Sequence, residues 1–452
     1  MIDWESAGTQ LAAALGGRQG LKERAERSGS KWPRYQNTSY PLVPLPVIVP
    51  SAAAAEHATT VEQYVSLLEK AIALYRANSA VRAYFGLDSL QEELVRAPSG
   101  LPREVCVCRL DGYLNAHDGS IQILEHNADA PAGTLFTGRL NGLVEEVASG
   151  VLSAAGCKLV PSGIDRADAL LSTLLQCYRE SGGKEAAPRI AILQETGKSN
   201  VESLEMAAEY TARGIETSVV DPKDLVFEAN AVSHAHRPIH IIWNKLNTVY
   251  WNQLLTRSPS WLRSWCDAIQ RRLVCHINPF SSRYIVENKR SVAFFQEDQF
   301  AASLTEAERQ LVRRILPWSR KLEVGKRVEL DGTSHDLWDL VWQRQVDFVL
   351  KEPYDIRGDG VTIGRAVDRQ TWERSVQRGF EEGHVVQRFV RALTYPILEL
   401  GANATVVPMT ISLDSFVLGG RFAGFGSKAS LNDKVNLFQG GRKVAVRIGA
   451  RA

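Results

Sequence analysis

The sequence lacks the patterns that mark membrane proteins and disulfide frameworks. None of its apolar runs is long enough to cross a bilayer, and its six cysteines contain no CxxC pair. The N-terminus shows no signal-peptide pattern, so we expect a reduced, cytoplasmic protein. A formal net charge of +2, from 53 basic and 51 acidic residues, favours neither nucleic acid nor a membrane surface as a partner.

Two common catalytic motifs are missing as well. Thr196-Gly197-Lys198-Ser199 follows a strand-like run, but a P-loop would need its first glycine at the position of Ile192. The chain shows no Ser-His-Asp or Cys-His constellation either. The P-loop interpretation therefore fails, and the sequence offers no candidate for a catalytic nucleophile.

Two short β-rich runs, at 105–111 and 121–127, are the most informative feature that is present. The polar segment between them has His117-Asp118-Gly119 at its centre, which is typical of a hairpin turn. A three-residue loop over 117–119, with Gly119 in the left-handed conformation, makes the cross-strand pairing symmetric about Asp118.

This register places four polar side chains together. Asp111 then faces Glu125, and Arg109 faces Asn127. Side chains alternate along a strand, so all four lie on one face of the hairpin. The opposite face takes the apolar neighbours Cys108, Leu110 and Leu124.

Two directly opposed carboxylates repel each other, so we expect a positive charge between Asp111 and Glu125. A hard divalent cation such as Mg²⁺ takes oxygen ligands, usually one or two carboxylates with phosphate oxygens and water. Asn127 would add a neutral oxygen. A surface hairpin with solvated charges is the alternative, but it must also explain why Arg109 and Asn127 share the same face.

The remaining segments predict a mixed α and β protein. Residues 4–15 are consistent with a helix, and apolar residues at helical spacing predict two packed helices between 60 and 97. Strands and helices then alternate, which is typical of a small parallel αβ layer. Its strands are expected at 189–193, 217–221 and 239–243, with helices at 165–180 and 201–213.

The last third of the chain carries residues suited to a nucleotide. Lys351 lies in a strand-like run, and Arg357-Gly358-Asp359-Gly360 follows it as a turn whose backbone N–H groups could approach phosphates. An ordinary hairpin turn is the alternative interpretation. Gln387, in the apolar run 385–390, could present its amide to an adenine edge, and Lys289 could reach a phosphate.

Together these motifs resemble the circularly permuted ATP-grasp superfamily, the group that includes glutathionylspermidine synthetase. The strongest match is Arg109-x-Asp111 followed by Glu125-x-Asn127, and the acidic hairpin precedes the lysines and the adenine strand instead of following them. The resemblance implies two Mg²⁺ ions held on ATP by Asp111, Glu125 and Asn127, with Arg109 steadying the transferring phosphoryl group. It also implies ATP contacts for Lys289, Lys351, Gly358, Gly360 and Gln387.

The resemblance implies a permuted ATP-grasp fold with a small pre-ATP-grasp-like αβ domain. Four segments are expected: a mainly helical part at 1–84, the Mg²⁺-binding part at 85–160, the αβ substrate-side domain at 160–275 and the ATP-binding part at 276–452. The match is weak between the motifs, and the 160–275 region matches only as a generic αβ layer.

The implied reaction is ATP-dependent amide formation between a small-molecule or peptide carboxylate and an amine, through an acyl phosphate. Phosphoryl transfer needs positioned cations more than a covalent nucleophile, which agrees with the absent triads. A kinase-like phosphotransferase on the same scaffold is a second possibility. A catalytically dead ATP-binding protein is the third, and the presence of Arg109 and all three metal-type ligands argues against it.

Overall fold

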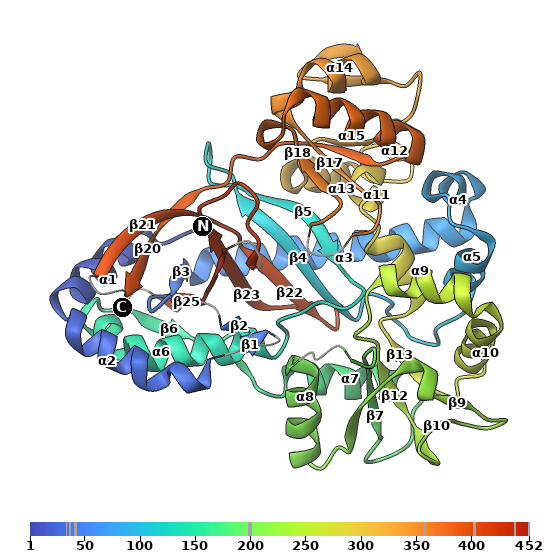
Figure 1. The fold of residues 1–452 in the computed structure, drawn as a ribbon, viewed down its shortest axis with the longest axis horizontal. Helices are drawn as coiled ribbons and strands as arrows, with labels where there is room; N and C mark the ends of the chain where they lie inside the picture. The colour runs from blue at the N-terminus through green and yellow to red at the C-terminus, as the bar shows by residue number, and fades with distance from the viewer. Residues whose placement is uncertain are drawn as a thin grey trace.

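The computed structural model describes residues 1–32, 34–35, 38–39, 43–197, 201–355, 358–400, 404–437 and 440–450. Lys198, Ser199 and Arg357, which belong to the two glycine motifs above, lie outside these ranges. Helices combine with several separate sheets, so the predicted mixed α and β class is confirmed. Figure 1 shows a central sheet, a smaller sheet with helices above it, and a parallel layer below and to the right.

The central sheet joins the early hairpin to the end of the chain. Its strand order is β20-β21-β23-β22-β4-β5, with β24 paired to β23, and the pairs are antiparallel. Strand β4 therefore lies beside β22 although about 300 residues separate them in sequence. The strands are β4 (Val107–Leu114), β5 (Ile121–Asn127), β20 (Thr394–Leu400), β21 (Ala404–Ile411), β22 (Asp414–Leu418), β23 (Arg421–Ser430) and β24 (Arg442–Val444).

A long helix, α3 (Ser51–Ala77), contributes to the core against the central sheet. Its buried side chains recur at three- and four-residue spacing, as expected of an amphipathic helix, and they share a core with Cys108 and Leu110 of β4. The predicted helix over 4–15 is confirmed as α1 (Trp4–Gly16). It is followed by α2 (Arg18–Ser28).

The prediction of two helices between 60 and 97 is wrong, because the structure has three. Helix α3 is followed by α4 (Ser79–Phe85) and α5 (Ser89–Arg96). Asn78 caps the first of these by accepting from the backbone N–H of Ala80, and Asp88 forms a capping box with Gln91 at the second. The caps divide one apolar periodicity into separate helices.

A four-stranded parallel sheet matches the predicted αβ layer. Its order is β13-β12-β7-β8, and each pair is parallel. These strands are β7 (Ile190–Leu193), β8 (Thr217–Val220), β12 (Ile241–Trp243) and β13 (Cys275–Ile277). The helices of this region are α7 (Ala169–Glu180), α8 (Val201–Ala212), α9 (Thr248–Arg257) and α10 (Pro259–Gln270).

The predicted lysine strand and glutamine strand belong to a third, four-stranded sheet. Its order is β14-β19-β17-β18, formed by β14 (Ser319–Lys321), β17 (Phe348–Lys351), β18 (Val361–Ile363) and β19 (Val385–Arg388). Helices α14 (Leu337–Gln343) and α15 (Arg369–Glu382) share a core with it. In Figure 1 this small sheet lies above β5.

The other elements connect or cover these sheets. Among the helices of the described ranges, none has the length and hydropathy that crossing a bilayer requires. The remaining helices are α6 (Phe136–Ala154), α11 (Arg290–Phe294), α12 (Asp298–Ala301) and α13 (Glu306–Ile315). The remaining strands are β1 (Arg34–Tyr35), β2 (Thr38–Ser39), β3 (Val47–Pro50), β6 (Lys158–Val160), β9 (Val226–Phe227), β10 (Val232–His234), β11 (Arg237–Ile239), β15 (Arg327–Leu330), β16 (Thr333–Asp336) and β25 (Val446–Ala450).

Candidate functional site

A cavity of about 460 Å³ lies where the central sheet, the small sheet and the loops of the parallel layer meet. This volume falls in the range of small-molecule sites, roughly 300–1,000 Å³. Eight of the nine predicted site residues line the cavity: Arg109, Asp111, Glu125, Asn127, Lys289, Lys351, Gly358 and Gln387. Residues more than 200 positions apart in the chain therefore meet around one space, and the ninth, Gly360, is not part of the lining.

The hairpin has the predicted pairing at the two positions that matter. Arg109 faces Asn127, and Asp111 faces Glu125. The predicted three-residue loop is wrong, however, because the N–H of Asn115 donates to the carbonyl of Ser120 and four residues connect them. Gly119 does adopt the left-handed conformation, with φ of +69°.

A β-bulge compensates for the extra loop residue. The register shifts between Asp111 and Gly112, so that Gly112 pairs with Ile123 and Leu124 is left without a cross-strand partner. The extra loop residue shifts the cross-strand pairing by one residue, and the extra residue Leu124 in β5 shifts it back. Asp111 therefore still pairs with Glu125. The bulge also corrects the place of Leu124, which was expected on the apolar face but lines the cavity.

The bulged residue connects the hairpin to the small sheet. The carbonyl oxygen of Leu124 accepts a hydrogen bond from Nζ of Lys351 at 2.8 Å and from Nε2 of Gln387 at 3.4 Å. Gln387 also donates to Oγ of Ser319 at 3.2 Å. Burial lowers the pKa of Lys351 to about 8.

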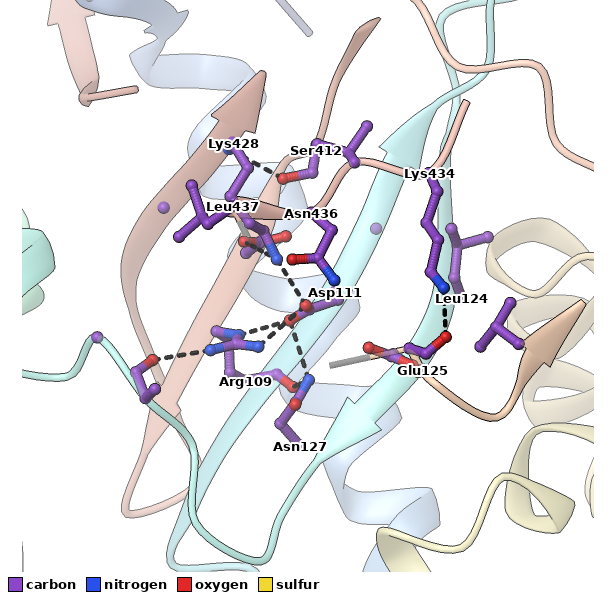
Figure 2. Close-up of a pocket in the computed structure, with 18 of the residues that line it drawn as sticks. Arg109, Asp111, Leu124, Glu125, Asn127, Ser412, Lys428, Lys434, Asn436 and Leu437 are labelled. Carbon is purple, nitrogen blue, oxygen red and sulfur yellow. Dashed lines mark hydrogen bonds and ion pairs between the residues drawn. The ribbon is translucent and has the colours of Figure 1, made fainter. Parts of the chain in front are cut away.

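Asp111 is the centre of a dense polar cluster, which Figure 2 shows together with its neighbours. Arg109 donates from Nε and Nη2 to the two Asp111 oxygens, at 2.5 and 3.0 Å. Nζ of Lys428 donates to Oδ2 at 2.8 Å, and Nδ2 of Asn127 donates to Oδ1 at 3.0 Å. Arg109 is held from its other side by the carbonyl of Ala132, at 2.8 Å from Nη1.

These contacts fix the charge of the cluster. Burial alone would raise the pKa of Asp111, but the Arg109 guanidinium and the Lys428 ammonium outweigh it and hold the pKa well below its ordinary value. Burial and the neighbouring Asp111 carboxylate raise the pKa of Asp414, which also pairs with Lys428 at 3.1 Å. Asp111 is therefore an anion at neutral pH.

Glu125 has a different partner. Oε2 of Glu125 lies 3.6 Å from Nζ of Lys289, and Lys289 makes a closer ion pair with Asp355. Burial lowers the pKa of Lys289, but the two carboxylates outweigh it and raise the pKa above its ordinary value. The positive charge expected near Asp111 and Glu125 is thus supplied here by side chains, with Arg109 and Lys428 on one carboxylate and Lys289 on the other.

Three residues of the site escaped prediction from the sequence: Asp414, Lys428 and Lys443. All three line the cavity, and they come from β22, β23 and β24. Cross-strand pairing sets Lys428 directly opposite Lys443. A lone lysine within the apolar and glycine-rich run of β23 was the only local signal for this group.

The two predicted glycines are required for different reasons, a positive φ at Gly358 and crowding at Gly360, and only Gly358 borders the cavity. A Cβ on Gly358, whose φ is +74°, would lie 2.6 Å from Cε of Lys434. A Cβ on Gly360 would lie 2.8 Å from Cβ of Asp355. Gly358 lines the cavity and its carbonyl accepts a hydrogen bond from Lys434, whereas Gly360 is not among the lining residues.

The oxygen donors of the hairpin suit a hard cation. Within the described ranges, no three His, Cys, Asp or Glu side chains converge as a metal site. An ion here would use the Asp111 and Glu125 carboxylates and Oδ1 of Asn127, which accepts no hydrogen bond from the described residues. Such a donor set fits Mg²⁺ that keeps waters or phosphate oxygens, and the ion would replace a side-chain cation on Asp111.

A buried ion pair attaches one wall of the cavity to the parallel layer. The Glu202 carboxylate accepts from the N–H groups of Gly133 and Leu135, each at 3.1 Å, at the start of α6. Nζ of Lys245 lies 2.9 Å from Glu202, and both side chains are almost fully buried. Burial would raise the pKa of Glu202, but Lys245 and the N–H donors lower it below its ordinary value.

We expect Glu202→Gln to lower the free energy of unfolding by ~3 kcal/mol, because it leaves the Lys245 ammonium buried without a counterion. Adding Lys245→Met should recover part of this loss. Urea denaturation at pH 7 measures both. Because the pKa of Glu202 is depressed in the folded protein, its contribution is present above the unfolded pKa and is lost as pH falls through the folded value. Equal stability of Glu202→Gln and wild type would contradict this role.

Comparison with known proteins gives structural matches only. No protein-family model and no curated protein sequence matches the chain. A glutathione synthetase-like effector from Globodera pallida, solved in its apo form, superposes with a TM-score of 0.61 at 14% identity, covering 96% of each chain. The fold is glutathione synthetase-like. A candidate γ-glutamylcysteine synthetase from Methylobacillus flagellatus matches at a TM-score of 0.42 and 11% identity, over 84% of this chain and 87% of that one.

The glutathione synthetase-like fold agrees with the coarse class expected from the motifs. The match to the Globodera pallida protein extends over nearly the whole chain, so it includes the central sheet, the small sheet and the parallel layer together. At this identity the likeness concerns the fold. Function has to be argued from the residues around the cavity.

Proposed function

We propose that the protein is an ATP-dependent carboxylate–amine ligase of the circularly permuted ATP-grasp type. The observation that carries the proposal is the meeting of two chemically different groups around one cavity. The carboxylate hairpin supplies Asp111 and Glu125, and separate elements supply Lys289 and Lys351, all lining the same space. Carboxylates that suit Mg²⁺ and lysines that suit phosphates are the two requirements of a Mg–ATP site.

The chain order supports the permuted arrangement. The hairpin at 107–127 precedes the small sheet that carries Lys351 and Gln387, yet the carbonyl of Leu124 accepts hydrogen bonds from both side chains. The metal-type and nucleotide-type parts are thus adjacent in space although their order is reversed. The glutathione synthetase-like fold is a further, coarser support.

The reaction assigns a task to each residue. Bound Mg²⁺ would neutralise charge on the ATP phosphates, with Asp111, Glu125 and Asn127 as its protein ligands. Lys289 and Lys351 would bind phosphate oxygens, and Gln387 would contact adenine. Arg109 would stabilise the charge on the γ-phosphoryl group as it passes to the substrate carboxylate. The amine then attacks the acyl carbon, loses a proton and expels phosphate, leaving an amide and ADP.

An ADP-release assay tests this proposal. We expect the protein with ATP and Mg²⁺ to release ADP only when a carboxylate pool and an amine pool are both present, because the acyl phosphate turns over when an amine attacks it. ADP release with one pool alone, together with a stable phosphorylated product, would instead support a phosphotransferase. No ATP binding and no ADP release with any pool would contradict both activities.

A further inference from the structure

The side chain of one lysine in the wall of the cavity has no partner among the described residues. Six lysines line the cavity, and five of them bond to a carboxylate or a carbonyl oxygen: Lys245, Lys289, Lys351, Lys428 and Lys434. Lys443, on β24, forms no hydrogen bond or ion pair with any residue of the part of the chain that the structure describes. Its ammonium group therefore faces the cavity without an ion pair to any described carboxylate.

A second unpartnered polar group lies beside it. The Thr137 side chain, in the first turn of α6, is 3% exposed and lines the cavity, and its Oγ1 finds no hydrogen-bond partner among the described residues. Oγ1 of Thr137 and Nζ of Lys443 lie 3.2 and 3.3 Å from the point where a Cβ on Gly133 would sit. The missing side chain of Gly133 leaves room between the two groups.

The electrostatics of this wall favour an anion. Burial and the nearby cations Arg109 and Lys428 together lower the pKa of Lys443 to about 8, against the opposing effect of Asp414 and Glu202. Arg109, Lys428 and Lys443 thus lie close together here. Among the described residues, the carboxylates of Asp111 and Asp414 form ion pairs with Arg109 and Lys428 but not with Lys443.

Apolar side chains form another part of the surroundings of the two groups. Phe136 and Leu140 of α6 and Phe416 of β22 line this part of the cavity, and Cζ of Phe416 lies 3.6 Å from the same Gly133 point. A ligand held by Lys443 and Thr137 therefore has carbon surface to pack against. This combination suits a carboxylate attached to an apolar group more than a fully hydrated inorganic anion.

We propose that Lys443 and Thr137 form a subsite that binds the carboxylate of an apolar organic acid, with its carbon chain against Phe136 and Leu140. The assignment of this acid as the donor substrate rests on the proposed ligase function. The carboxylate would accept one hydrogen bond from the Lys443 ammonium and one from the Thr137 hydroxyl, both of which lack partners in the described structure.

Binding of 4-phenylbutyrate and of its neutral primary amide tests the subsite directly. Saturation-transfer NMR without ATP or Mg²⁺ measures both affinities, so the result does not depend on ligase activity. We expect wild type to bind the acid at least about tenfold more tightly than the amide, because a charge-assisted hydrogen bond to a carboxylate is stronger than one to a neutral amide. Lys443→Met should abolish this preference, and Thr137→Val should reduce it about fivefold.

Two further measurements separate this site from general charge effects. Lys434→Met, which removes another cavity lysine whose partner is the Gly358 carbonyl, should leave acid binding unchanged. Wild-type affinity for the acid should decline as pH rises through about 8, where free Lys443 loses its proton, and Lys443→Arg should bind the acid without this decline.

Each opposite result would overturn the subsite. These results are equal binding of acid and amide, no acid binding by wild type, acid preference retained by Lys443→Met, or an equal loss in Lys434→Met. Thr137→Val provides an independent variant if Lys443→Met does not fold. A negative ADP assay with a positive binding result would reject the ligase and keep the subsite, and the reverse pattern would reject the subsite alone.

Discussion

Glu125→Gln is expected to reduce kcat by about 10³-fold, which corresponds to ~4 kcal/mol of transition-state stabilisation. The substitution replaces a carboxylate ligand of the proposed Mg²⁺ site by a neutral amide. The fold should be retained, because Lys289 keeps its closer ion pair with Asp355 and only the 3.6 Å contact to Glu125 weakens. Steady-state ADP release at increasing Mg²⁺ concentrations measures the effect.

The Mg²⁺ titration makes this prediction specific. A weakened metal site should require more Mg²⁺ for half-maximal activity, whereas a defect elsewhere in the cavity would not. Asp118→Asn is the matched control, because Asp118 is an exposed carboxylate at the tip of the same hairpin and accepts from the nearby Ser120 N–H at 2.9 Å. We expect its kcat to stay within about twofold of wild type. An unchanged kcat in Glu125→Gln would reject Glu125 as a ligand.

The local part of this site could be predicted from the sequence. Arg109, Asp111, Glu125 and Asn127 lie within one hairpin, so a two-residue period and a turn glycine were enough to place them on one face. Even here the loop was misjudged by one residue. The pairing came out right because the bulge at Leu124 shifts the register back.

The long-range part could not be predicted in the same way. Lys428 and Asp414 reach the site only because β22 pairs with β4 across some 300 residues, and local propensity does not encode the register of such a pairing. Glu202 looks like an ordinary helix residue in the sequence. Its contact with the start of α6 arises from tertiary packing of α8 against the segment that precedes α6.

The convergence of these two parts also changes how Asp111 should be regarded. From the sequence it was a metal ligand opposed by another carboxylate. In the structure Arg109 and Lys428 donate to its two carboxylate oxygens, and the amide nitrogen of Asn127 donates to Oδ1. The negative charge of Asp111 is therefore already neutralised by Arg109 and Lys428. Mg²⁺ entering with ATP would free Lys428 to contact phosphate oxygens, and would free Arg109 to stabilise the γ-phosphoryl group as it is transferred.

Arg109→Ala should separate binding from chemistry for this reason. We expect kcat to fall by about 10²–10³-fold, because one charged donor aimed at the transferring group is lost, while the Kd for ATP changes by less than about threefold. Asp111 stays in place, since Lys428 and Asn127 still donate to its carboxylate at 2.8 and 3.0 Å. Single-turnover ADP formation at saturating ATP measures the chemical step, and equilibrium nucleotide binding measures Kd.

Arg109→Lys sharpens the same test. The lysine keeps the positive charge but loses the planar fork that now donates to both Asp111 oxygens and to the Ala132 carbonyl. If geometry matters as much as charge, the lysine variant should remain at least about tenfold slower than wild type. A loss of ATP affinity with a normal rate at saturation, in either variant, would instead make Arg109 a binding residue and remove its role in the transition state.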